Sequence, residues 1–238
     1  DFADGEWWTA EGFITWDFLE NHRLIAGGEY RDSRAQTQEN YDSYGTYLDE
    51  ESDIDTWGLF LQDTFSVSEL ISFNMGLRYD EYTNAGDTVN PRLAAILAPS
   101  DATSLKFLYG TAFRAPNVYE LFYDDSGISQ KANDSLQPEK ISSYEFVAER
   151  QFNRNIRASA SVFYNDIDDL IVLVTDPADE LLLFENLGRA RAKGLEIDLS
   201  GRWGGGWIAA LSYTFQDAED GDGDWLVNEA LPVWIRER

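Results

Sequence analysis

The sequence predicts an all-β fold, an antiparallel transmembrane β-barrel fragment. Three observations predict it. Apolar and polar residues alternate with a period of two along most of the chain. The alternating segments are longer than the ~5–6 residues usual for strands of soluble proteins, and match the ~9–11 residues that cross a bilayer on a tilt. The connections alternate between short and long, as they do in membrane β-barrels.

Ten complete strands and the start of an eleventh are expected from this alternation. In one of them Phe73, Met75 and Leu77 share a face, and Asn74 and Arg78 lie on the other. Taken in order, the expected strands are residues 6–18, 22–34, 54–66, 70–83, 89–99, 103–114, 140–151, 155–167, 184–200 and 206–217, with the eleventh beginning near Leu231.

The connections assign each end of the strands to one side of the membrane. Short links are expected at residues 19–21, 67–69, 100–102, 152–154 and 201–205, and mostly long ones at 35–53, 84–88, 115–139, 168–183 and 218–230. Because outer-membrane barrels have short periplasmic turns and long extracellular loops, the second set is expected outside the cell. Aromatic residues near the strand ends fit interfacial girdles: Trp7, Trp8, Trp57, Tyr82, Tyr164 and Trp207.

Composition excludes several classes of function. The formal net charge of −26 would repel phosphate backbones, so nucleic acid is not an expected partner. The chain has no cysteine, and His22 is its only histidine, so thiolate metal sites and histidine-based catalytic triads have no residues to form from. A soluble β-sandwich whose loops bind calcium or carbohydrate remains an alternative, and purification without detergent would identify it.

Motifs that occur in a fixed order add a family resemblance. Thr111–Leu121 reads TAFRAPNVYEL, and Leu136–Lys140 reads LQPEK before Tyr144 and Glu145. Phe163–Ile171 reads FYNDIDDLI, and Glu185–Glu196 reads ENLGRARAKGLE. This series resembles the barrel of TonB-dependent outer-membrane receptors, from about Trp57 onward. The residues that carry the family pattern, for which we expect structural roles, are Phe113, Arg114, Pro116, Asn117, Glu120, Leu121, Pro138, Glu139, Tyr144, Glu145, Asn186, Gly188, Gly194 and Glu196.

The resemblance implies a role in nutrient uptake. Such barrels have about 22 strands and a plugged lumen, so residues 1–238 would form part of one barrel domain without its plug, and we expect further sequence on both sides. The whole protein would lie in outer-membrane lipid, bind a scarce nutrient complex, most commonly a ferric siderophore, and use TonB through regions absent from this chain. Cobalamin or another large solute is an alternative substrate. A passive porin or an outer-membrane enzyme is an alternative class, and a plug upstream would exclude the porin.

Candidate ligand contacts lie in the long connections, because tyrosine offers a flat apolar face and a polar tip. These candidates are Tyr41, Tyr44, Tyr47, Tyr119, Phe122 and Tyr123, with loop packing as the alternative role for each. Lys106 and Arg114 are expected to point into the lumen, where wall carboxylates could pair with them: Glu145, Glu149, Glu196 and Asp198. No catalytic residues are expected, since no nucleophile and base accompany these carboxylates.

One acidic connection could bind calcium through hard oxygen ligands, although no cofactor is required. Its residues are Asp217, Glu219, Asp220, Asp222 and Asp224. The glutamate that an EF-hand carries at its last position is missing, so a solvated acidic loop is the competing interpretation. The same two interpretations apply to a second acidic group: Asp166, Asp168, Asp169, Asp176, Asp179 and Glu180.

Overall fold

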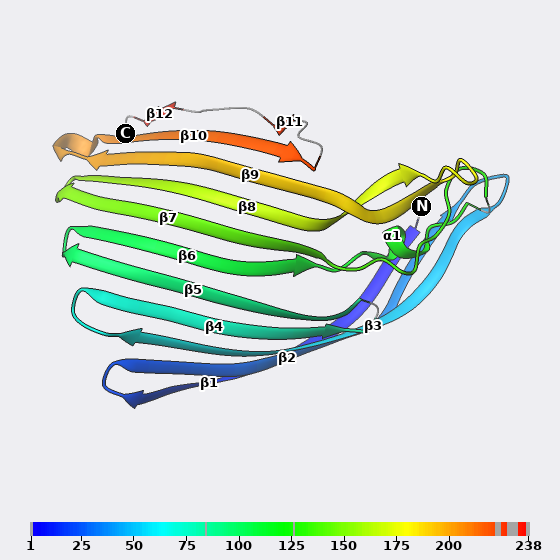
Figure 1. The fold of residues 1–238 in the computed structure, drawn as a ribbon, viewed down its shortest axis with the longest axis horizontal. Coiled ribbons are helices and arrows are strands. Elements are labelled where there is room, and N and C mark those ends of the chain that lie inside the picture. Colours follow the sequence, from blue (N-terminus) through cyan, green and yellow to red (C-terminus); the bar gives the residue numbers. More distant parts are fainter. Residues whose placement is uncertain (1, 84, 126, 222–224, 228–232, 237–238) are drawn as a thin grey trace.

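A computed structural model describes residues 2–83, 85–125, 127–221, 225–227 and 233–236. It confirms the all-β prediction, because these residues form one antiparallel sheet in which each long strand pairs with its neighbour in sequence (Figure 1). The strands are β1 Phe2–Leu19, β2 His22–Tyr41, β3 Thr46–Ser66, β4 Ile71–Tyr82, β5 Gly86–Ser100, β6 Thr103–Arg114, β7 Glu139–Asn153, β8 Ile156–Thr175, β9 Leu182–Arg202, β10 Ile208–Asp220, β11 Trp225–Val227 and β12 Val233–Arg236. A short helix, α1 Val118–Phe122, and a 3-10 turn, Gly204–Gly206, complete them. Among the described residues, no helix has the length and apolarity needed to cross a membrane.

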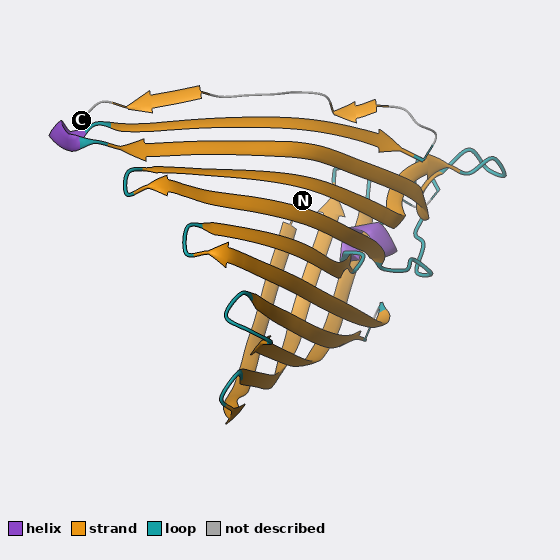
Figure 2. Cartoon of the chain, turned by 60° about the vertical axis from the view of Figure 1, so that its left-hand side comes forward, coloured by secondary structure: helices purple, strands orange, loops and turns teal. Residues whose placement is uncertain are grey.

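The sheet twists and curls into a trough, as Figure 2 shows. Tight turns join β1 to β2, β3 to β4, β5 to β6 and β7 to β8 at one end, and α1 lies at the other (Figure 1). β11 and β12 both pair with β10, at Ala218–Glu219 and Ile208–Leu211 respectively, so they lie along the same edge. The expected strand start at Leu231 is outside the described residues, and pairing with β10 already occurs at β11.

The two faces of the sheet differ in polarity, as the alternation predicts. Leu61 pairs with Leu77, and Phe107 pairs with Phe146, which in turn pairs with Val162; these side chains are 44 to 52% exposed. So continuous an exposed apolar surface is unfavourable in water and favourable against lipid. We call this the apolar face. The polar face carries Asn74, Arg78, Lys106 and Glu149 among other residues, at the intervening positions.

Aromatic rings form a belt across the apolar face towards the α1 end. Ring centroids lie 5.3 Å apart for Trp8 and Tyr30, 5.1 Å for Trp57 and Tyr79, and 5.0 Å for Tyr109 and Tyr144. Tyr164 continues the belt beside Tyr144 at 6.4 Å. The expectation was wrong for Trp7 and Tyr82, because the register places both on the polar face, where Trp7 lies under Arg31 and Tyr82 contacts Phe113. Trp207 lies at the opposite end of the sheet, after the 3-10 turn.

The prediction of long connections was wrong for residues 35–53 and largely wrong for 168–183. β2 continues to Tyr41 and β3 begins at Thr46, so residues 42–45 alone form the turn, and residues 176–181 alone join β8 to β9. Residue pairs such as Gln38 and Glu50 are polar on both sides of the hairpin. These strands extend past the aromatic belt. A strand with water on both faces lacks the alternation of apolar and polar residues by which strands are recognised in a sequence. Residues 218–230 include Asp220 at the end of β10 and all of β11, and the rest of that stretch is described only in part.

Two glycines of the polar face allow aromatic rings to lie flat on the neighbouring strand. A Cβ at Gly194 would lie 2.5 Å from Cζ of Phe163 and 2.4 Å from the carbonyl oxygen of Phe215. A Cβ at Gly27 would lie 2.5 Å from Cζ of Phe60. Neither position can accept a side chain without movement, which gives Gly194 of the family pattern a packing role.

Candidate functional site

The candidate site lies at the α1 end of the sheet, where three connections meet. Residues 115–138 leave β6, form α1 and return to β7, and they run beside the start of β9 (Figure 1). The Lys131 N–H donates to the Leu182 carbonyl at 2.9 Å, and the Leu182 N–H donates to the Ser129 carbonyl at 2.8 Å. α1 also contacts β3, which forms a hairpin with β2. The prediction of a long connection at 115–139 is therefore confirmed.

A small hydrophobic core fixes this loop to the sheet. Leu121, Leu136 and Ile171 are buried, with exposed fractions of 1, 2 and 8%, and Phe122 and Phe184 pack against them. Leu121 is the only large side chain below 2% exposure among the described residues. Phe122, expected as a ligand contact, thus packs the loop in this structure.

Arg114 joins the end of β6 to the helix and to β7. Its Nη1 and Nη2 donate to the two oxygens of Glu120 at 2.9 and 3.0 Å, and its Nε and Nη2 donate to those of Glu139 at 2.6 and 2.8 Å. Glu120 completes a capping box with Asn117 at the start of α1, and Glu139 also accepts the Ile171 N–H at 2.9 Å. Bidentate pairs of this kind fix geometry as well as charge.

The remaining residues of the family pattern close the loop on the sheet. Asn186 accepts the Gln137 N–H at 2.7 Å and donates to the carbonyls of Gln137 and Asp169, each at 2.8 Å. A Cβ at Gly188 would lie 2.7 Å from Cβ of Leu170, so the β8 bulge needs glycine there. Pro116 and Pro138 are buried at the two ends of the loop.

Asp125 organises the tip of the loop. Its carboxylate accepts the N–H groups of Ile128, Ser129 and Gln130 at 2.9 to 3.0 Å, and also the Ser129 hydroxyl. Burial acts to raise the pKa of this carboxyl, but these hydrogen bonds outweigh it and lower the pKa to about 2. Asp125 therefore stays charged at neutral pH and holds the turn.

A second charged contact ties the same loop to the connection between β8 and β9. Lys131 Nζ lies 2.5 Å from Asp176 and 2.8 Å from Asp179. The hydrogen bond to Asp176 is the main cause of a raised pKa for Lys131, and it lowers the pKa of Asp176. Two of the expected acidic residues thus pair with a lysine in this structure.

Two of the six candidate ligand residues lie against each other, and a third, Tyr47, is on β3, the strand that contacts α1. The rings of Tyr119 and Tyr123 lie 4.6 Å apart, and Phe184 of β9 lies 6.0 Å from Tyr119. Tyr47 donates to Asp42 at 2.9 Å, and this bond is the main cause of its raised pKa, to which Tyr123 and Asp125 also contribute. We call Tyr47, Tyr119, Tyr123 and Phe184 the aromatic surface.

Tyr41 and Tyr44 are not part of that surface, although Asp42 accepts the Tyr44 N–H as well as the Tyr47 hydroxyl. Tyr41 and Tyr44 lie at the tip of the β2–β3 hairpin, with Tyr44 91% exposed. Phe184 was not singled out from the sequence, because it appears there as one more apolar residue of a strand.

The wall charges pair differently from the sequence expectation. Lys106 contacts Glu149 at 2.7 Å, as expected, but the carboxylates that hold Arg114 are Glu120 and Glu139. Glu145 and Glu196 lie on the polar face opposite Phe163 and Ser161, and Asp198 accepts the Ser212 hydroxyl at 2.6 Å. A further cluster on this face joins Arg78 to Asp80 and Glu29.

The acidic residues proposed for calcium lie mostly along a strand. Asp217, Glu219 and Asp220 belong to β10, and Asp217 pairs with Lys193 at 3.1 Å. Asp222 and Asp224 are outside the described residues. In the described part of the chain no three acidic, histidine or cysteine side chains group as metal ligands, and calcium binding stays a prediction. Of the second acidic group, Asp166 and Asp168 contact Arg189, Asp169 lies 3.8 Å from Lys140, and Glu180 lies in the turn after β8.

Comparison with known proteins agrees with this architecture. A family model described as the β-barrel of TonB-dependent receptor-like proteins matches residues 1–233. An iron-regulated outer membrane virulence protein of Vibrio cholerae is 26% identical over 192 residues, which cover 74% of this chain and 29% of that protein. A vitamin B12 transporter of Vibrio vulnificus is 25% identical over 184 residues, covering 77% of this chain and 28% of that protein.

A solved structure shows the same fold. The ferric enterobactin receptor of Pseudomonas aeruginosa superposes with a TM-score of 0.78 at 21% identity, over 90% of this chain and 36% of that one. The chain spans well under half the length of each of these relatives. With a family match over nearly all of its residues, an apolar outer face and a polar inner one, this chain belongs to the β-barrel of the TonB-dependent outer-membrane receptors.

Proposed function

We propose that the protein containing this chain takes up a ferric siderophore across the outer membrane, and that the aromatic surface contributes to binding it. The supporting observation is that Tyr119 and Tyr123, on the loop held by Arg114 and Asp125, lie 4.6 Å apart where α1 contacts β3, the strand that carries Tyr47. Rigid aromatic rings lose little conformational entropy on binding, and flat chelating groups can stack on them.

The polar face would line the solute's route, and energy would come from TonB through regions outside this chain. Siderophore transport is favoured over cobalamin transport because two relatives are named as a probable siderophore receptor and a ferric enterobactin receptor, and the solved structure described above is a ferric enterobactin receptor. The vitamin B12 transporter keeps cobalamin as the second candidate substrate. No catalytic role is proposed for the wall carboxylates.

Replacing Tyr119 and Tyr123 together by alanine should weaken binding of the preferred chelate about tenfold or more, as expected for the loss of aromatic contacts. Equilibrium binding to the full-length receptor is measured with ferric catecholates, ferric hydroxamates and cobalamin. Tyr44→Ala removes a more exposed tyrosine outside the aromatic surface and should change the dissociation constant less than twofold.

Two results would contradict the proposal. If the unsubstituted receptor binds a ferric chelate and the double variant binds it with the same dissociation constant, the aromatic surface is not the contact. Tight binding of cobalamin with no binding of any ferric chelate would mean that the receptor takes up cobalamin instead of a siderophore.

A further inference from the structure

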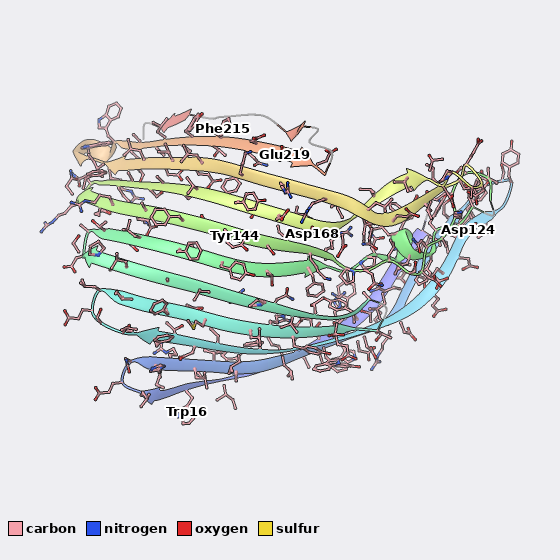
Figure 3. All side chains as sticks on the ribbon, in the orientation of Figure 1. Trp16, Asp124, Tyr144, Asp168, Phe215 and Glu219 are labelled. Carbon is pink, nitrogen blue, oxygen red and sulfur yellow. The ribbon has the colours of Figure 1, made fainter. Side chains whose placement is uncertain are left out.

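Four cations gather on the apolar face of β7 and β9, in a chain that has 18 basic residues and a net charge of −26. Tyr144 pairs with Tyr164, which pairs with Lys193, so these three side chains share that face. The register then places Lys140, Arg189 and Arg191 on the same face, beyond the aromatic belt towards the extracellular end. In Figure 3, Asp168, which pairs with Lys140, lies nearer to the α1 end than Tyr144 does.

One carboxylate orients the two arginines. Asp166 Oδ1 lies 3.5 Å from Nε of Arg189 and 3.3 Å from Nε of Arg191, and Asp168 lies 2.8 Å from Nε of Arg189. These contacts run through Nε, so the edge of each guanidinium between its two terminal nitrogens is a separate pair of donors. The fork geometry of arginine suits phosphate, which accepts two parallel hydrogen bonds.

Arg191 and Lys193 are more exposed than the carboxylates they contact. The side chain of Arg191 is 43% exposed and that of Asp166 is 23% exposed, and Lys193 and Asp217 are 57 and 19% exposed. Arg189 and its partner Asp168 are similarly exposed, at 46 and 51%. At Arg191 and Lys193 an approaching anion therefore meets the cation before the carboxylate.

The opposite part of the sheet lacks this feature. Beyond the belt on β2, β3 and β4, the same face carries Asp32, Asp55 and Glu81, and the cation there is Arg34, which contacts Asp32 at 3.4 Å. Asp32 accepts the indole N–H of Trp8 and Glu81 accepts the hydroxyl of Tyr79, so both carboxylates anchor belt residues. The basic group is thus local to β7 and β9 and continuous with the lipid-facing belt.

We propose that Arg189 and Arg191, with Lys140 and Lys193 beside them, clamp phosphate groups of lipid headgroups in the outer leaflet. The belt places these residues at headgroup level, where basic side chains are attracted to an anionic lipid surface. The clamp fixes one side of the barrel to phosphorylated lipid.

Replacing both arginines by glutamine tests the clamp in the full-length receptor. Native mass spectrometry measures retention of phosphatidic acid, with phosphatidylcholine as the zwitterionic comparison. The affinity for phosphatidic acid should fall about 10- to 30-fold, while that for phosphatidylcholine stays unchanged. Arg189→Lys with Arg191→Lys keeps the charge and loses the fork, so it should retain part of the affinity.

A matched control removes two arginines from the tight-turn end, Arg23→Gln with Arg154→Gln, and should leave lipid retention unchanged. An equal loss in this control would overturn the clamp. So would equal retention of phosphatidylcholine and phosphatidic acid by the unsubstituted receptor. If inorganic phosphate at millimolar concentration binds and displaces the lipid as effectively as added phosphatidic acid, the clamp is a site for free phosphate and the assignment to the membrane is wrong.

Discussion

Replacing Arg114 by alanine should release residues 115–138 from the sheet. Glu120 and Glu139, each with a side chain 12% exposed, would lose their shared cation, and the capping box of α1 would lose the charge that balances it. Removing one partner of a buried ion pair costs about 3–5 kcal/mol, and because Arg114 is 43% exposed we expect about 2–4 kcal/mol here. Hydrogen exchange in the full-length protein should show faster exchange throughout this loop and unchanged exchange in β4 and β5.

Neutralising Glu139 as well as removing Arg114 shows whether the loop is released by an unpaired charge or by lost packing. In the double variant Arg114→Ala with Glu139→Gln, part of the lost protection should return, because an uncompensated carboxylate is no longer left half-buried. If hydrogen exchange in the loop is equally slow in Arg114→Ala and in the unsubstituted protein, the core around Leu121 holds the loop without the ion pairs of Arg114.

Arginine in place of Leu77 should destabilise the barrel by about 2–4 kcal/mol in a bilayer, the cost of a cation on the lipid face near the midplane. Leu77 is 52% exposed on the apolar face of β4, between Leu61 and Pro91. Unfolding by denaturant in lipid vesicles, followed by the gel mobility of the folded barrel, gives the free energy.

Asn74→Arg is the matched control, because Asn74 lies on the polar face of the same strand, where its amide contacts Thr64. The polar face accepts charge, so the cost there should stay below about 1 kcal/mol. Equal destabilisation by both substitutions would contradict the assignment of lipid to the apolar face.

The strands could be predicted from the sequence where the chain crosses lipid. Between the belt and the tight turns, each strand has one face in lipid and one in water. Apolar and polar residues therefore alternate along β4. Beyond the belt both faces are wet, so the extension of β2 from 35 to Tyr41 resembled a loop. Strand ends are therefore predictable only as far as the difference in solvent extends.

The candidate site was predictable in part. The motif around Arg114 identified important residues, but their pairing depends on the chain doubling back through α1, which no periodicity encodes. Sequence alone indicated wall carboxylates as partners for Arg114, and the structure instead brings Glu120 and Glu139 to it. Three of the four cations of the lipid clamp alternate along β9 and the fourth, Lys140, lies on β7. Only the strand register places all four on one face, so their grouping also required the structure.

Cysteine scanning along β4 tests the central claim, that one face of this sheet meets lipid and the other meets a water-filled lumen. Residues 1–238 contain no cysteine, so single cysteines at positions 71 to 80 give unambiguous labels in the full-length protein in vesicles once any cysteines elsewhere in it are replaced. We predict that a charged thiol reagent modifies cysteine at the even positions, including Asn74 and Gly76. At the odd positions, including Met75 and Leu77, a bilayer-soluble quencher should instead reach an attached fluorophore. Equal modification at neighbouring positions, or protection of both faces in a protein that is soluble without detergent, would contradict the account.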